Sequence, residues 1–275
     1  MSSSEISSVA AIGTDHMTLT HCWKNDHVFN AAWAYDLAFA WDVSPELDIV
    51  LGLAGLDRAS TGKLLVPACG TGRHALALAE RGFQVEASDL NAAMLARAIE
   101  LRGHPRIRYQ LADMTQPMGD GTADCDAVFT FCNSFRYILD AAGVHGHLAT
   151  VRTRLRPGGI YVLELALNQA AAAIGQRARW IVRHDWREVH ACWTLRSLTP
   201  PTSLETAEIR VIDEDGTVHE FSADQPQRLW TRAALEEFAT IAGLDVMAVV
   251  DTQGVAISQT EVPVRSYVAL QRRAS

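Results

Sequence analysis

A glycine-rich turn between an apolar strand and a helix constrains the fold of this chain more than any other feature. Lys63 to Pro67 is predicted to form a short strand, and Thr71 to Arg81 a helix, with Gly70 and Gly72 at the turn. Glycines permit the tight turn and let a ligand approach the backbone closely. Asp89 ends the next predicted strand, where a carboxylate can accept hydrogen bonds from both hydroxyls of a ribose. The turn therefore predicts a nucleoside site.

Strands and helices alternate after this turn, which is typical of a mostly parallel sheet with helices on both faces. The further predicted strands are Gln84–Ser88, Ile107–Leu111, Ala127–Phe131 and Ile160–Leu165. The helices between them run from a cap at Asn91 to about Leu101, and from Val144 to Leu155. Before the turn, Val28 to Trp41 has helical spacing, and a second helix begins at Ser44-Pro45 and ends near Leu56.

The pattern changes after Ala170. Longer, half-exposed strands are predicted at Trp180–Val189, Ala191–Leu198, Thr206–Ile212 and Thr217–Ser222, with a hairpin turn at Glu214-Asp215-Gly216. These strands indicate an antiparallel insert, expected to cover the acceptor pocket or to form a contact in a homodimer. The α/β pattern then resumes with a helix from Thr231 to Ala242 and strands at Val246–Val250 and Ser266–Gln271.

Composition narrows the choice of partners and compartment. The net charge is −8, without a long basic run, so a nucleic acid is not the expected partner. The five cysteines form no CxxC pair, which disfavours a disulfide framework or a structural zinc site and favours a reducing, cytoplasmic compartment. His145 and His147 are two positions apart on a predicted helix and thus on different faces, so no metal site is expected. The sequence also contains no apolar stretch of the ~20 residues that a transmembrane helix needs, so a membrane is not an expected partner.

Three further motifs give the glycine turn a family context. Leu111-Ala112-Asp113-Met114 closes the third strand with a second carboxylate, Cys125 to Phe129 opens the fourth, and Leu155-Arg156-Pro157-Gly158-Gly159 precedes the fifth. In this order and spacing the segments resemble the class I S-adenosylmethionine (SAM)-dependent methyltransferases, over roughly Lys63 to Ala166. Ala34-Tyr35-Asp36 and the run from Asn133 to Tyr137 further resemble bacterial small-molecule N-methyltransferases.

The resemblance implies a fold class and a domain organisation. The expected fold is α/β: a doubly wound, mostly parallel seven-stranded sheet with helices on both faces, an antiparallel β insert after the fifth strand, and an N-terminal helical cover. The expected divisions are a flexible tail (1–20), the helical cover (21–56), the SAM-binding core (57–173), the insert (174–229) and the completion of the core (230–275).

The resemblance also implies a set of contacts with the cofactor. The methionine part of the cofactor would contact Ala68, Cys69, Gly70 and Gly72. Arg73 would contact the carboxylate of the cofactor, or could equally be a solvated arginine on the first helical turn. Asp89 would hold the ribose, Leu90 and Met94 would border the adenine, Asp113 and Met114 would meet its edge, and Phe131 would lie beside the sulfonium. The chain departs from the family at Val66, where an acidic residue is usual, and at Ala68, where the first loop glycine is usual.

The predicted acceptor side follows from the rule that ligands bind beyond the carboxyl ends of parallel strands. Asn133, Ser134 and Arg136 follow the fourth strand; a capped helix start with Arg136 in solvent is the alternative. Glu164 is a candidate substrate contact or a structural ion pair, and Trp33 and Trp186 are candidate pocket walls or ordinary core residues. Tyr35, on a helix that would fold over the cofactor, and Asn133 are the predicted catalytic residues; a core tyrosine is the alternative for Tyr35.

These features predict a SAM-dependent methyltransferase that acts on a small molecule, with nitrogen as the favoured acceptor atom because no obligatory base is evident. Natural-product biosynthesis is the setting we favour. The alternatives are methylation of oxygen, carbon or a peptide, a nicotinamide-dependent oxidoreductase that uses the same glycine turn, and a SAM-binding scaffold protein without catalysis.

Overall fold

The computed structural model describes residues 27–57, 61–118, 123–169, 173–258 and 265–273. The expected tail at residues 1–20 lies outside these ranges. The chain forms two compact units. We call them the α/β unit (residues 43–170, 199–202 and 226–275) and the β unit (residues 1–42, 171–198 and 203–225). This division groups residues 27–42 with the insert and residues 43–57 with the large sheet.

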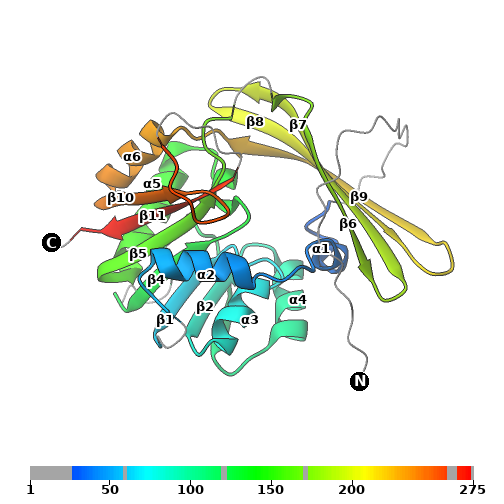
Figure 1. Ribbon diagram of the computed structural model, residues 1–275, viewed down its shortest axis with the longest axis horizontal. Helices are drawn as coiled ribbons and strands as arrows, with labels where there is room; N and C mark the ends of the chain where they lie inside the picture. The colour runs from blue at the N-terminus through cyan, green and yellow to red at the C-terminus, as the bar shows by residue number, and fades with distance from the viewer. Residues whose placement is uncertain (1–26, 58–60, 119–122, 170–172, 259–264, 274–275) are drawn as a thin grey trace. The chain divides into compact units, whose positions relative to one another are not determined.

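The α/β unit is built on a seven-stranded sheet with the order β10-β11-β5-β4-β1-β2-β3 (Figure 1). The strands are β1 (Lys63–Pro67), β2 (Gln84–Asp89), β3 (Ile107–Leu111), β4 (Cys125–Thr130), β5 (Leu155–Leu165), β10 (Leu244–Val250) and β11 (Ser266–Arg272). Strands β1 to β5 pair in parallel, and β11 is antiparallel to both β5 and β10. The expected doubly wound, mostly parallel fold is therefore confirmed.

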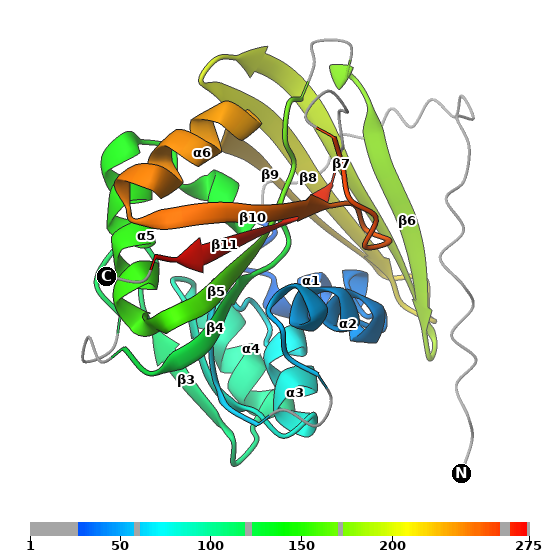
Figure 2. The ribbon, with the colours of Figure 1, turned by 60° about the vertical axis from the view of Figure 1, so that its left-hand side comes forward.

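Helices cover both faces of this sheet, as Figure 2 shows. Helices α3 (Arg73–Glu80) and α4 (Ala92–Arg102) pack on β2 and β3, and α2 (Ser44–Leu53) packs on α3. Helices α5 (Ala141–Arg154) and α6 (Arg232–Ile241) pack together over β5 and β10. The core between sheet and α5 includes the fully buried Val128, Leu148 and Leu163, and full burial of each such side chain contributes about 1.5–3 kcal/mol.

Local side-chain chemistry sets several helix starts. The side chain of Asn91 accepts hydrogen bonds from the backbone N–H groups of Ala93 and Met94, and Thr231 caps α6 in the same way through Ala234. Both caps are confirmed predictions. Asp140 caps α5, so this helix begins earlier than predicted, and it ends at Arg154 because Leu155 already belongs to β5.

The β unit contains a four-stranded sheet in the order β6-β7-β8-β9. The strands are β6 (Arg177–His184), β7 (Arg187–Thr199), β8 (Thr202–Ile212) and β9 (Val218–Arg228). The expected antiparallel insert after the fifth strand is confirmed, and Gly216, with a φ of 82°, lies in the predicted hairpin turn. The predicted strand Trp180–Val189 is wrong, because a turn at Asp185-Trp186 divides it into β6 and β7. Asp185 adopts a φ of 52°, which Asp tolerates in such a turn.

The predicted helix Val28–Trp41 is shorter in the structure, where α1 spans Ala32–Ala38. Ala31 at its start provides no side-chain cap, and Phe39 already leaves the helix. Aromatic side chains instead pack α1 on the sheet of the β unit: the indole N–H of Trp180 donates to the carbonyl of Ala38 at 2.6 Å. Among the described residues, no helix is long and apolar enough to cross a bilayer.

Candidate cofactor and acceptor site

The glycine turn after β1 adopts left-handed backbone conformations at Ala68, Gly70 and Gly72, with φ of 52°, 55° and 81°. Ala68 is strained there, because a Cβ disfavours this region. A Cβ built on Gly70 would meet no atom within 4 Å, whereas one on Gly72 would lie 2.6 Å from the hydroxyl of Tyr109. The turn thus presents bare backbone at Gly70, which fits the close approach of a ligand.

Asp89 ties this turn to the end of β2. Its two carboxylate oxygens accept hydrogen bonds from the backbone N–H groups of Gly70 and Asn91, both at 2.8 Å. Burial raises the pKa of Asp89, although these N–H donors act in the opposite direction. Each carboxylate oxygen has a further lone pair that can accept from a ribose hydroxyl. The residues present therefore fit a nucleoside. Leu90 beside Asp89 is exposed, and Met94 is buried on α4.

The second predicted carboxylate, Asp113, lies in the segment after β3. One of its oxygens accepts from both the N–H and the hydroxyl of Thr115, each at 2.8 Å. The next residue, Met114, is held through its carbonyl by the imidazole of His147 at 3.0 Å. The described strand ends thus place Asp89 and Asp113 after neighbouring parallel strands, at the same edge of the sheet.

The turn after β4 carries the residues predicted to face the sulfonium and the acceptor. Phe131 stacks on the imidazole of His74, with ring centroids 3.9 Å apart and planes at 6°. Cys132 and Asn133 both have a φ of 55°, so two consecutive residues are left-handed. The carboxylate of Glu164 holds this turn by accepting from the N–H of Cys132 at 2.8 Å and from the side chain of Asn133 at 3.3 Å.

Asn133 therefore uses its amide within the protein, since its side-chain oxygen also accepts from the N–H of Ala166 at 2.6 Å. Ser134 begins a short 3-10 helix, Ser134–Tyr137, without a side-chain cap. The alternative of Arg136 in solvent is wrong: Arg136 is buried, and its guanidinium donates to the carbonyl of Arg228 and the side chain of Gln169.

An ion-pair network joins this turn to residues far away in the sequence. Arg265 donates to Glu164 at 2.7 Å and to Glu46 at 3.0 Å, and the other oxygen of Glu46 lies 2.9 Å from the imidazole of His74. Burial alone would raise the pKa of Glu46, but His74 and Arg265 lower it to about 2. Burial lowers the pKa of His74.

Sequence reasoning did not select Glu46, His74 or Arg265. His74 follows the glycine turn by two positions, and that place in the sequence was the available signal for it.

The predicted aromatic residues of the β unit contact another aromatic ring or a single arginine. Tyr35 stacks on Phe39 at 4.3 Å between centroids. The guanidinium of Arg187 lies 5.6 Å from the ring of Trp33 and 4.2 Å from that of Trp186. The roles predicted for Tyr35, Trp33 and Trp186 at the cofactor and acceptor remain predictions. Among the described residues, no group of His, Cys, Asp and Glu side chains is arranged to hold a metal ion.

Comparison with known proteins bears on the family and the fold of the chain. Residues 65–159 match the model of a family described as a methyltransferase domain. A protein of Geobacillus sp. (strain WCH70), named as a methyltransferase, is 24% identical over 193 residues, which are 70% of this chain and 77% of that protein.

Two solved structures cover nearly all of the chain. The SAM-bound CalS10 from Micromonospora echinaspora, an amino pentose methyltransferase involved in calicheamicin biosynthesis, has a TM-score of 0.68 and 24% identity, covering 92% of this chain and 99% of that one. The sugar N-methyltransferase KedS8 from Streptoalloteichus sp. has a TM-score of 0.69 and 21% identity, covering 96% and 99%. The predicted methyltransferase and its fold are confirmed.

Proposed function

We infer that this chain, a SAM-dependent methyltransferase, transfers the methyl group to a nitrogen atom of a small molecule. The cofactor supplies an electrophilic methyl group, so the protein has to align the acceptor with it and exclude water. The acceptor must bring a lone pair. A neutral amine has one, whereas a hydroxyl group needs a base to remove its proton.

The observation that carries this proposal is the state of two ionisable groups, Glu164 near the carboxyl end of β5 and His74 in the first turn of α3. Glu164 is buried and pairs with Arg265, while it also holds the backbone of Cys132. His74 is buried, stacks on Phe131 and contacts Glu46. Both candidate bases are thus engaged in holding the turn after β4. This arrangement suits an acceptor that needs no base, and it favours nitrogen over oxygen or carbon.

Amino sugars are the first acceptors to test, because KedS8 is a sugar N-methyltransferase and CalS10 an amino pentose methyltransferase. Natural-product biosynthesis, the setting of CalS10, is the corresponding proposal for this chain. A cytoplasmic location is a further proposal, supported by four cysteines that are free among the described residues, and a homodimer is another.

The test is methyl transfer from ¹³C-methyl SAM to a panel of nucleotide-linked amino sugars, with the matched hydroxy sugars and free glycine as controls. We expect an N-methyl signal by NMR with at least one amino sugar, and a rate that rises with pH up to the pKa of the acceptor amine. Methylation of the hydroxy sugars at equal rates would contradict nitrogen as the acceptor atom. Binding of NAD, but not of SAM or S-adenosylhomocysteine, would contradict the cofactor.

A further inference from the structure

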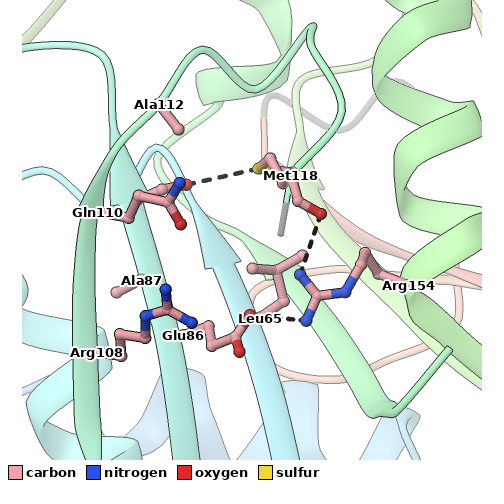
Figure 3. A pocket seen from close by; sticks show the side chains of 9 residues that line it. Leu65, Glu86, Ala87, Arg108, Gln110, Ala112, Met118 and Arg154 are labelled. Atoms are coloured by element: carbon pink, nitrogen blue, oxygen red, sulfur yellow. Dashed lines mark hydrogen bonds and ion pairs between the residues drawn. The ribbon is translucent and has the colours of Figure 1, made fainter. Parts of the chain in front are cut away.

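The connection between β3 and β4 has no helix in its described part, residues 112–118 and 123–124. Parallel strands of such sheets are usually joined by a helix that covers the sheet. Here the segment 112–118 lies over β1, β2 and β3, where Ser88, Gln110, Met118 and Arg154 line a small pocket (Figure 3). Its volume of about 10 Å³ corresponds to about one water molecule. The segment therefore takes the place of a helix without the internal hydrogen bonds of one.

Three side chains of α5 supply hydrogen bonds to this segment. His147, Thr150 and Arg154 bond the carbonyl oxygens of Met114, Gln116 and Met118 at 3.0, 3.3 and 3.2 Å. We call these three residues the α5 row. They lie three and four positions apart, on one face of the helix, and they reach the carbonyl of every second residue. The α5 row thus holds residues 114–118 along the helix, with a turn at 114–115 that is closed by a hydrogen bond from the N–H of Gln116 to the carbonyl of Asp113.

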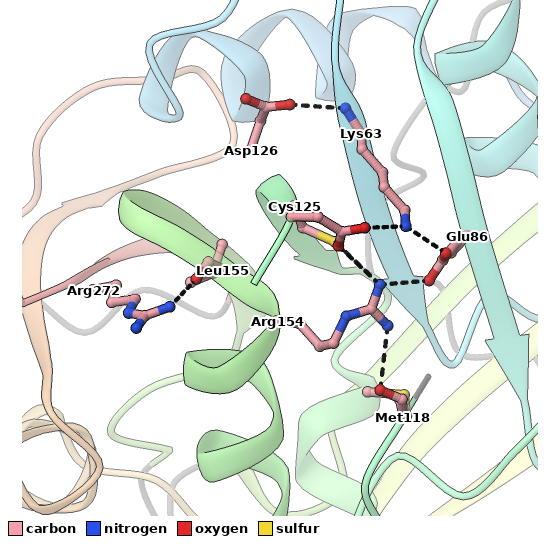
Figure 4. A network of polar contacts seen from close by, with 9 residues as sticks. Lys63, Glu86, Met118, Cys125, Asp126, Arg154, Leu155 and Arg272 are labelled. Atoms are coloured by element: carbon pink, nitrogen blue, oxygen red, sulfur yellow. Dashed lines mark hydrogen bonds and ion pairs between the residues drawn. The ribbon is translucent and has the colours of Figure 1, made fainter. Parts of the chain in front are cut away.

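The donors of the α5 row are themselves fixed. Because a carbonyl can only accept, His147 must donate from Nδ1 to Met114, and its Nε2 lies 2.9 Å from the hydroxyl of Tyr161 on β5. Arg154 pairs with Glu86 on β2 at 2.7 Å, as Figure 4 shows. It also pairs with Asp124 at 3.2 Å. Both His147 and Arg154 are buried. The sheet therefore determines where these two donors point.

Close backbone packing extends this contact to Asp113. A Cβ on Gly146 would lie 2.4 Å from the carbonyl oxygen of Thr115, so only glycine permits the present distance between α5 and the segment. Thr115 is the residue whose N–H and hydroxyl bind the carboxylate of Asp113. A displacement of Thr115 would therefore move Asp113.

We propose that the α5 row and Gly146 position Asp113 for the adenine of the cofactor. Helix α5, which contacts residues 114–118 rather than the nucleoside, would thereby determine the affinity for the nucleoside. The proposal rests on the SAM-dependent function and on the predicted contact of Asp113 with adenine. His147, Thr150, Arg154 and Gly146 are positioning residues in it, since each acts through the segment. A purely structural role would alter stability but would not discriminate between parts of the cofactor.

The first test compares Gly146→Ala with Gly52→Ala, which makes the same change in another helix, α2. A Cβ on Gly52 would meet no atom within 4 Å, whereas one on Gly146 would meet the backbone of Thr115. We expect Gly146→Ala to weaken binding of S-adenosylhomocysteine and of 5′-methylthioadenosine by the same factor, about tenfold. Its KM for SAM should rise with kcat nearly unchanged, and Gly52→Ala should bind both ligands as the unaltered protein does.

A second, milder pair keeps the proposal testable if Gly146→Ala does not fold. Thr150→Val removes the bond to Gln116, while Thr153→Val removes a hydroxyl that bonds the carbonyl of Ala149 within α5 itself. We expect a several-fold weaker affinity for 5′-methylthioadenosine only in Thr150→Val. His147→Leu should weaken it further, and His147→Asn, whose amide can donate in place of Nδ1, should restore part of it.

Nucleoside affinities equal to that of the unaltered protein in Gly146→Ala, Thr150→Val and His147→Leu would overturn the proposal. Equal losses in the control variants Gly52→Ala and Thr153→Val would overturn it as well. Binding of S-adenosylhomocysteine by the unaltered protein and its transfer of methyl to an amine are measured separately. A failure of the proposed function is thereby distinguishable from a failure of this inference.

Discussion

Replacement of Asp89 by asparagine tests the nucleoside site most directly. The two oxygens of Asp89 accept from the N–H groups of Gly70 and Asn91 and would each accept from one ribose hydroxyl. A hydrogen bond to a charged group contributes about 1.5–3 kcal/mol, against about 0.5–1.5 kcal/mol for a neutral pair. Asparagine keeps one oxygen and removes the charge, so we expect a loss of about 1.5–3 kcal/mol. That loss corresponds to a roughly 10- to 100-fold weaker affinity for S-adenosylhomocysteine.

The change in stability should be smaller than the change in affinity. Because burial raises the pKa of Asp89, its carboxylate is less well solvated than in the unfolded chain. Asparagine relieves that cost but leaves one backbone N–H facing an amide donor. These effects oppose each other, and we expect the free energy of unfolding to fall by no more than about 2 kcal/mol. Asp140→Asn is the matched control, because it makes the same substitution at the N-cap of α5. Asparagine and aspartate are equally good helix caps.

The assay is isothermal titration with S-adenosylhomocysteine and its 2′-deoxy analogue, accompanied by thermal unfolding. The unaltered protein should prefer the complete ribose, and Asp89→Asn should lose most of that preference, which isolates the contact as a double-mutant cycle does. Equal affinities of the variant and the unaltered protein for S-adenosylhomocysteine would show that the ribose binds elsewhere. Loss of affinity with the preference retained would show that Asp89 acts only by holding the turn.

Three further predictions follow from the strained turn, the ion-pair network and the N-terminal helix. Ala68→Gly removes left-handed strain of about 1–2 kcal/mol and adds about 0.4–1 kcal/mol of unfolded-state entropy cost, so urea unfolding should show a stability gain of up to about 1.6 kcal/mol. Destabilisation would contradict the φ of 52° at this position. The pKa of Glu46 is lowered from 4.5 to about 2, which corresponds to a contribution of about 3 kcal/mol to the free energy of unfolding. This contribution should be present above pH 4.5 and lost as the pH falls toward 2. Glu46→Gln should therefore flatten the acid limb of the curve of unfolding free energy against pH, and an unchanged limb would exclude the network as its cause. Tyr35→Phe should lower kcat several-fold to ~10-fold with S-adenosylhomocysteine affinity almost unchanged; unaltered turnover would remove Tyr35 from the site, and a large loss of thermal stability would favour a core role beside Phe39.

Local chemistry made much of the fold predictable. Asn91 and Thr231 cap helices because a side-chain oxygen can reach the N–H groups two or three residues ahead, whatever the rest of the chain does. The strand of residues 107–111 was predicted with its observed bounds, because its residues suit an extended chain between a proline and an acidic turn. The turn at Asp185-Trp186 was missed, because a single aspartate followed by tryptophan is a weaker turn signal than a pair such as Asp-Gly.

The sequence alone determined the glycine turn, the two carboxylates at the strand ends and hence the class of cofactor, because each depends on residues within a few positions of one another. Only the tertiary structure decided which side chains hold these parts in place. Arg265 meets Glu46 across 219 positions, and His147 meets the carbonyl of Met114 across 33. Such contacts form because burying a charge or a hydrogen-bond donor without a partner costs free energy. The available partners are the groups that lie nearby in the folded chain. That choice depends on the packing of helices against the sheet, and no local pattern of residues encodes it.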